Sequence, residues 1–282
     1  MSSENSKNRI YTREEYIFLS KLYTKAELYK EVINFIKEFI KLNPKLDKEE
    51  CDILSTGFKN MITDKRNSWL TLNSMERKEK KKKINTVKEI KEIKNHIENE
   101  IRETCKDLQD LIDKYLIPKN DEDETKVFLY KLKADYFRYI CEFAEGKEYE
   151  NSLIKAEEFY KKAYDISDKK LPIISCNRVS VALNYAIFLY EIKKDKKNGF
   201  DIAQKTFKDS MKFSEDLERP KFRDTLLIIH LLKENIIFWN SEMSEEEEKS
   251  KYRDTLLIIQ LLKENIIFWN SEMSEEEQKS VE

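Results

Sequence analysis

The chain has 282 residues, of which 38% are charged and 40% hydrophobic, and its formal net charge is −2. Three glycines and four prolines are too few for the tight turns of a β-sheet protein, so we expect an all-α fold. The balanced charge does not indicate a nucleic-acid-binding protein. We interpret the basic run at 77–83 as a solvated helix end or loop rather than a polyanion site.

Cysteine spacing and the start of the chain bear on the cellular compartment. Cys51, Cys105, Cys141 and Cys176 are too far apart for a CxxC redox or zinc motif, which indicates reduced thiols. The polar start MSSENSKNR does not resemble a signal peptide, and no run approaches the roughly 18 apolar residues of a membrane span. We therefore expect a cytoplasmic protein that binds neither membranes nor nucleic acid.

Helix-forming segments follow one another along the chain, separated by capping residues, prolines and glycines. A capping box of Thr12 and Glu15 opens a first helix near residue 13, and Pro44 ends a second. The next expected helices are a long third one from about Lys48 into the basic run, a fourth from about Thr86 to Leu116, a fifth opened at 121–125 and closed by Gly146, and a sixth over 151–167. Pro172 precedes a seventh helix that runs to about Lys194, Gly199 opens an eighth and Pro220 introduces a ninth.

Consecutive amphipathic helices joined by short turns indicate an antiparallel array of nine helices with a concave groove. In the fourth helix we expect a buried stripe formed by Ile90, Ile93, Ile97 and Ile101.

The ninth helical segment is present twice, because residues 251–280 repeat residues 221–250. The second copy differs in three residues, with Tyr252 for Phe222, Gln260 for His230 and Gln278 for Glu248. We expect a helical domain over 1–240, followed over 241–282 by an acidic linker and a duplicated tenth helix. This copy is too apolar to remain in water, so we expect it to dock on the array or exchange with another protomer. A recent duplication with little function is the alternative.

No arrangement of residues typical of catalysis stands out. The three glycines, at positions 57, 146 and 199, cannot form a P-loop or a GxGxxG motif. His96 and His230 are the only histidines, and both lie on charged helix faces. We therefore expect no enzyme activity, no cofactor and no metal.

Two pairs of polar residues are candidates for anion binding. Lys59 and Arg66 are seven residues apart, which places both cations on one face of the third helix. Arg138 and Tyr139 lie within the aromatic stretch ADYFRYICEF, where a charge is costly unless it is paired. Together they would offer two guanidinium forks, an ammonium and a phenol to a phosphate.

Three of the polar side chains in apolar helices leave two interpretations open. Arg138 could form a buried ion pair with Asp135 or Glu142 instead of binding a phosphate. Asn184 and Asn235 lie among apolar residues, where an unpaired amide would cost about 1 to 3 kcal/mol. Each amide could bond the backbone of an extended peptide, or another helix of the core, since it carries both a donor and an acceptor.

Five segments resemble the 14-3-3 family of all-helical, dimeric adaptors, which bind phosphoserine and phosphothreonine peptides. They are REEYIFLSKLYTKAELY, LSTGFKNMITDKRNSW, LKADYFRYICEF, VALNYAIFLYEI and DTLLIIHLLKENIIFW, in the family's order over roughly residues 13–240. The resemblance implies a phosphate-binding set of Lys59, Arg66, Arg138 and Tyr139. It also implies a peptide-binding set, in which Lys131, Asn184, Glu191 and Asn235 contact the main chain or flanks and Leu183, Ile187, Leu227, Ile228, Leu231 and Trp239 form an apolar wall.

The sequence departs from the family at positions that pair the protomers. Leu28 replaces the family's first-helix arginine and Ile93 a dimer tyrosine, so we expect a homodimer whose interface is either more apolar or weaker. The loop before the seventh helix reads Cys176 and Asn177, where the family usually has a proline and an isoleucine. Phosphorylated Ser280, close to the C-terminal carboxylate, could also occupy the phosphate site of its own or a second chain.

These observations predict an adaptor that binds phosphorylated partner proteins in signal transduction and catalyses nothing. The alternative is a tetratricopeptide-like scaffold that binds unmodified peptides. No sustained 34-residue period runs through the chain, which argues against that alternative.

Overall fold

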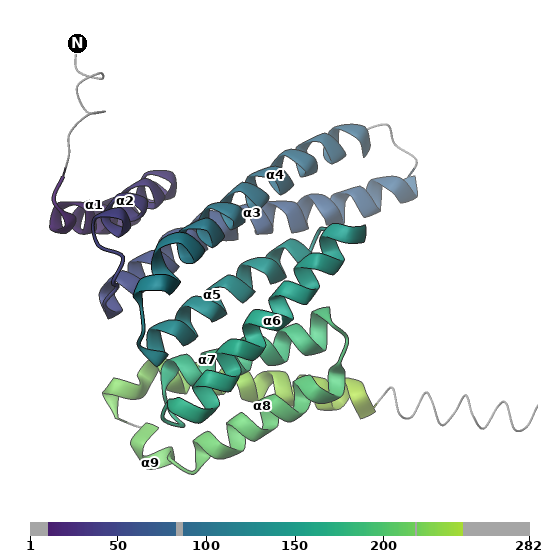
Figure 1. Cartoon of the computed structure of the whole chain (residues 1–282). Coiled ribbons are helices and arrows are strands. Elements are labelled where there is room, and N and C mark those ends of the chain that lie inside the picture. Colours follow the sequence, from purple (N-terminus) through teal and green to yellow (C-terminus); the bar gives the residue numbers. More distant parts are fainter. Residues whose placement is uncertain (1–10, 83–86, 218, 245–282) are drawn as a thin grey trace, which may run out of the picture. The chain divides into compact units, whose positions relative to one another are not determined.

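The computed structural model describes residues 11–82, 87–217 and 219–244, and all the regular structure within these ranges is helical (Figure 1). The expected all-α fold is therefore confirmed. The chain divides into two compact units, residues 1–229 and residues 230–282. The duplicated helix expected over 251–280 and the tail around Ser280 lie outside the described residues.

The helices of the first unit pack as consecutive pairs (Figure 1). The four pairs are α1 (Arg13–Lys25) with α2 (Tyr29–Leu42), α3 (Lys48–Lys82) with α4 (Val87–Leu111), α5 (Asp123–Cys141) with α6 (Gly146–Lys170), and α7 (Cys176–Ile187) with α8 (Lys196–Met211). Between the pairs, α2 contacts α3, α4 contacts α5, and α6 contacts α7. Shorter elements connect them, namely η1 (Ile112–Leu116), η2 (Ile117–Lys119), η3 (Phe188–Ile192), α9 (Ser214–Leu217) and η4 (Pro220–Phe222).

The helix over residues 223–244 is the last described element, and residues 230–244 of it belong to the second unit. None of the described helices is long and apolar enough to span a membrane.

Local side-chain chemistry explains the helix starts that the sequence predicts. The backbone N–H of Thr12 donates to Glu15 Oε2 at 2.8 Å, and the Glu15 N–H donates to Thr12 Oγ1 at 3.3 Å, which completes the capping box of α1. The long helix begins at Lys48, as expected. The basic run at 77–83 continues α3 as far as Lys82, and its described side chains at 77, 78 and 80 are exposed, as expected for a solvated helix end.

Two glycines have roles that differ from the expected ones. Gly146 does not end α5, which stops at Cys141; it begins α6 with a φ of 57°, a conformation that other residues avoid. Gly199 does not open α8, which starts at Lys196. A Cβ at Gly199 would lie 2.8 Å from the Ala186 carbonyl oxygen, so this glycine allows α8 to approach the end of α7 closely.

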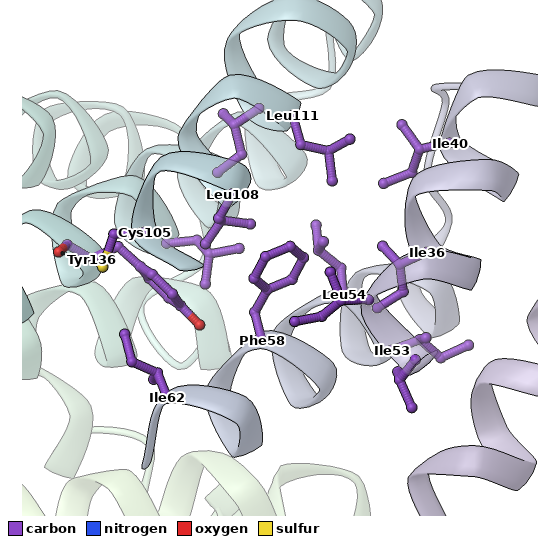
Figure 2. Packing of buried hydrophobic residues seen from close by; sticks show 14 of the residues in the cluster. Ile36, Ile40, Ile53, Leu54, Phe58, Ile62, Cys105, Leu108, Leu111 and Tyr136 are labelled. Carbon is purple, nitrogen blue, oxygen red and sulfur yellow. Dashed lines mark hydrogen bonds between the residues drawn. The ribbon is translucent and has the colours of Figure 1, made fainter. Parts of the chain in front are cut away.

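The largest buried cluster lies where α2, α3, α4 and α5 meet (Figure 2). Ile36 from α2, Leu54 and Phe58 from α3 and Leu108 from α4 are all fully buried. Tyr136 from α5 approaches Phe58 edge to face, with 6.4 Å between the ring centroids. This core fixes α3 against α5, the two helices that carry the expected phosphate-binding residues.

The buried stripe expected on α4 is wrong at Ile93, which is 51% exposed, whereas Ile90, Ile97 and Ile101 are buried. At 100° per residue Ile93 lies about 60° from Ile90, at the edge of the stripe. Leu28 is 48% exposed and is the N-cap of α2 rather than a residue of the first helix.

The expected loop residues Cys176 and Asn177 are the first two residues of α7. Helix α7 therefore starts after Pro172, as expected, but it already includes the two residues that we expected in the preceding loop.

Candidate functional site

Two arginines from different helices converge on one carboxylate. Arg66 of α3 donates from Nε and Nη2 to Glu142 at 2.7 and 2.5 Å. Arg138 of α5 places Nη1 3.6 Å from the same carboxylate. Both guanidinium groups also lie over the ring of Tyr139, 4.1 Å and 4.7 Å from its centroid. We call Arg66, Arg138, Tyr139 and Glu142 the arginine cluster.

The arginine cluster is partly shielded from water but not closed. The side chains of Arg66, Arg138 and Glu142 are 24%, 15% and 18% exposed. An open pocket of about 780 Å³ borders Glu142, with Trp69 among its lining residues. Burial and the nearby Asp135 charge raise the pKa of Tyr139, so its hydroxyl remains protonated at neutral pH and is available as a donor.

Lys59 lies two helical turns before Arg66 on α3, a rise of about 10.5 Å along the helix axis. Its side chain is exposed, and no carboxylate of the described part of the chain is paired with its ammonium. It therefore adds an uncompensated positive charge to the same face of α3.

A second carboxylate, that of Asp135, is buried and contacts several neighbouring residues. Asp135 is 4% exposed and accepts hydrogen bonds from Lys131 Nζ at 2.8 Å, Tyr160 Oη at 2.5 Å and Asn184 Nδ2 at 2.8 Å. Its Oδ1 lies 3.9 Å from Arg138 Nη2. Burial opposes ionisation of Asp135, but the charges of Lys131 and Arg138 outweigh it and lower the pKa of this carboxyl group. We call these five residues the Asp135 network.

The structure contains the ion pairs that the sequence left as an alternative for Arg138, because both Asp135 and Glu142 lie within ion-pair distance of it. These pairs do not neutralise the region. Three cations, Arg66, Lys131 and Arg138, pair with these two carboxylates. With Lys59 on the same face of α3 as Arg66, the region has an excess of two positive charges.

The amides of the two asparagines have different partners. Asn184 makes the core bond that the sequence left open, since its Nδ2 donates to Asp135. Asn235, in the second unit, is partly exposed, and its Nδ2 donates to the Leu231 carbonyl of its own helix at 2.9 Å. This bond within its own helix is neither of the two partners that the sequence left open for the Asn235 amide.

The expected apolar wall is unevenly exposed. In the first unit Leu183 is buried at 6% exposure, Ile187 and Ile228 are partly buried, and Leu227 is 58% exposed. Glu191, also in this unit, is exposed.

In the second unit Leu231 is 49% exposed and Trp239 is fully buried. Of the expected site residues, the contacts of the first unit bring together Arg66, Lys131, Arg138, Tyr139 and Asn184.

Tyr160 of α6 was missed by the sequence analysis, although its hydroxyl touches both Arg138 and Asp135. With Ala156 and Ala163 it occupies one helix face, a pattern that indicates packing alone. Nothing in the local sequence distinguishes this tyrosine from an ordinary core aromatic residue.

Comparison with known proteins identifies the family. Residues 19–240 match the family model for 14-3-3 protein. The chain is 34% identical over 232 residues to 14-3-3-like protein GF14 epsilon of Arabidopsis thaliana, covering 82% of this chain and 91% of that protein. It is 36% identical over 236 residues to 14-3-3 protein epsilon of Drosophila melanogaster, covering 82% and 88%.

A third relative is checkpoint signal transducer rad25 of Schizosaccharomyces pombe, 34% identical over 232 residues, covering 82% of this chain and 86% of that protein. These findings do not favour the tetratricopeptide-like alternative. Proteins of the matched family are non-catalytic adaptors that bind phosphorylated partner proteins and usually form dimers. The chain belongs to the 14-3-3 family.

Proposed function

We propose that this protein binds phosphoserine or phosphothreonine in partner proteins at the arginine cluster, with Lys59 adding positive charge. The observation that carries the proposal is the convergence of Arg66 and Arg138 on a single carboxylate, Glu142. The two guanidinium groups therefore already hold one anionic group, the Glu142 carboxylate of the chain itself. A phosphate would bring about −1.5 to −2 charge and three acceptor oxygens to the same guanidinium groups, with a hydrogen bond from Tyr139.

The charge of the region supports a dianionic ligand. Four cations and two carboxylates leave an excess of two positive charges, which matches one phosphate group. An unmodified serine would leave this excess unbalanced. The phosphorylated form of a ligand should therefore bind much more tightly than its unmodified twin.

The rest of the ligand would lie in a groove as an extended chain. Because Asn184 Nδ2 donates to Asp135, the side-chain oxygen Oδ1 of Asn184 would accept a hydrogen bond from a backbone N–H of the ligand. Lys131, Glu191 and Asn235 would contact the ligand's main chain or flanks. The apolar wall would consist of Leu183, Ile187, Leu227, Ile228, Leu231 and Trp239.

The protein would act as a cytoplasmic homodimer. Leu28 and Ile93 are 48% and 51% exposed, which is consistent with a subunit interface built from more apolar contacts. Two binding sites in one dimer would engage doubly phosphorylated partners, with an avidity gain of about 10² to 10⁴. Phosphorylated Ser280 would be a candidate ligand from the same or a second chain.

One titration tests the proposed function. Fluorescence polarisation would compare a short peptide bearing one central phosphoserine, selected from a degenerate library, with its unphosphorylated twin. We expect the phosphorylated peptide to bind at least about 100-fold more tightly, which corresponds to about 2.7 kcal/mol. Equal affinity for the two peptides would reject the proposal and indicate instead a scaffold that binds unmodified peptides.

A further inference from the structure

We propose that Asp135 and Tyr160 are positioning residues of the phosphopeptide site. They hold Arg138, Lys131 and Asn184 in the orientation that binds the ligand, while neither contacts the ligand itself. This inference rests on the proposed function.

Tyr160 controls how the Arg138 guanidinium is presented. Tyr160 is fully buried on α6, and its hydroxyl accepts from Arg138 Nε at 3.0 Å while donating to Asp135 Oδ1 at 2.5 Å. With Nε engaged inside the protein, the two terminal amino groups of Arg138 are the donors left for an anion. A free arginine side chain would lose several rotamers on binding, and this hydroxyl removes part of that cost beforehand.

Asp135 fixes groups from three helices at once. It accepts from Lys131 on its own helix α5, from Tyr160 on α6 and from Asn184 on α7. The bond to Asn184 also determines which end of that amide faces away from the carboxylate. Arg66 is held separately, by Glu142, so the Asp135 network governs one half of the site.

Charge alone predicts the opposite role for Asp135. It is an anion in a site that would bind an anion, and its removal raises the excess of positive charge from two to three. On electrostatic grounds Asp135→Asn should therefore tighten phosphate binding. If Asp135 acts by positioning, the same substitution weakens binding, because a neutral amide no longer holds Lys131 and Arg138 or fixes the Asn184 amide.

The decisive experiment measures the affinity of the full chain for the phosphoserine peptide and for its unphosphorylated twin by fluorescence polarisation. We expect Asp135→Asn to weaken phosphopeptide binding about tenfold or more. Unchanged or tighter binding overturns the proposal. The comparison of the two peptides on the wild-type chain tests the proposed function separately. If the wild-type chain does not prefer the phosphorylated peptide, the proposed function is rejected. If it does, and Asp135→Asn keeps the full preference, only the positioning role is rejected.

Tyr160→Phe provides a second variant with a matched control. It removes one hydroxyl and keeps the ring, and we expect phosphopeptide affinity to fall about tenfold while the twin binds as before. The control is Tyr136→Phe, since the buried Tyr136 hydroxyl makes no hydrogen bond within the described part of the chain. We expect this control to leave both affinities unchanged.

The two variants together leave a clear result in every case. Circular dichroism of each variant checks that its helicity is intact. A general loosening of the fold would lower the affinity for both peptides and not only for the phosphorylated one. If Asp135→Asn fails to fold, Tyr160→Phe decides. Tyr160→Phe affinity within twofold of wild type overturns the proposal, because the positioning of Arg138 runs through this hydroxyl.

Discussion

Arg66→Ala separates binding from stability better than any other change in the arginine cluster. The substitution removes the two donors that hold Glu142 at 2.7 and 2.5 Å and the cation over Tyr139. Glu142 keeps Arg138 Nη1 at 3.6 Å as a partner, so it is not left as an isolated charge. Because both members of the pair are partly exposed, at 24% and 18%, we expect a loss of only about 1 kcal/mol in the free energy of unfolding.

The effect of Arg66→Ala on ligand binding should be much larger. Two hydrogen bonds from a guanidinium to a phosphate contribute about 1.5 to 3 kcal/mol each, so their loss corresponds to a Kd about 10² to 10⁴ times higher. The excess of positive charge also falls from two to one. Arg138→Ala should weaken binding as well, but it also removes the donor to the buried Tyr160 hydroxyl and the cation 3.9 Å from Asp135, at a cost of about 1 to 3 kcal/mol in stability. Asp135 keeps Lys131, Tyr160 and Asn184 as partners.

The assay is fluorescence polarisation of the phosphoserine peptide, with thermal unfolding measured on the same samples. Arg102→Ala is the matched control, since Arg102 donates from Nε and Nη2 to Glu148 at 2.8 and 3.0 Å and lies over Phe143. It should lower stability slightly and leave the Kd unchanged. This account is refuted if the Kd of Arg66→Ala for the phosphopeptide is within threefold of the wild-type value, or if Arg66→Ala loses no more affinity than Arg102→Ala.

Three further predictions follow from single features of the structure. Gly199→Ala should lower the free energy of unfolding by about 1 to 3 kcal/mol in a denaturant titration, because its Cβ would meet the Ala186 carbonyl oxygen at 2.8 Å; an unchanged midpoint would contradict this packing. Tyr136→Phe should leave the melting temperature unchanged or raise it, since the lost hydroxyl has no partner within the described residues, and a clear drop would reveal one. Phosphopeptide affinity measured by calorimetry should fall from pH 7 to pH 5, because phosphoserine loses its second charge near pH 6. The pKa of Asp135 is lowered and that of Tyr139 raised, so neither group titrates between pH 5 and pH 7. A pH-independent affinity would show that the second negative charge of the phosphate does not contribute to binding.

The helices were predictable because their signals are local. The capping box at Thr12 and Glu15, the stop at Pro44 and the start at Lys48 each depend on residues within one or two turns. The two glycines whose roles were predicted wrongly show where such local signals fail. Gly146 and Gly199 both read as helix boundaries, but a packed neighbour sets the role of Gly199, and that neighbour is distant in the sequence.

The candidate site was predictable in its residue types but not in its contacts. Spacing placed Lys59 and Arg66 on one helix face, and the aromatic surroundings of Arg138 marked a charge that needed a partner. The meeting of Arg66 with Glu142 joins residues 76 positions apart, so it depends on how α3 packs against α5 and no local pattern reports it. The bond from Asn184 to Asp135 spans 49 positions, and for the same reason its amide remained open to two interpretations.

The internal carboxylate at Glu142 leads to a last prediction, on peptides that carry glutamate in place of phosphoserine. Such a peptide would offer Arg66 a single carboxylate, the same group that already accepts from this guanidinium at 2.7 and 2.5 Å. Exchanging one carboxylate for another at Arg66 gains no hydrogen bond and balances at most one of the two excess positive charges, and the peptide would still lose its freedom of motion on binding. A phosphate adds up to one further negative charge and one further acceptor oxygen, and these can engage Arg138 and Tyr139 while Glu142 stays in place. We therefore expect the glutamate peptide to bind more than tenfold more weakly than the phosphoserine peptide in the polarisation assay. Glutamate binding within tenfold of phosphoserine would mean that Glu142 does not compete for the arginines and that a single negative charge satisfies the site.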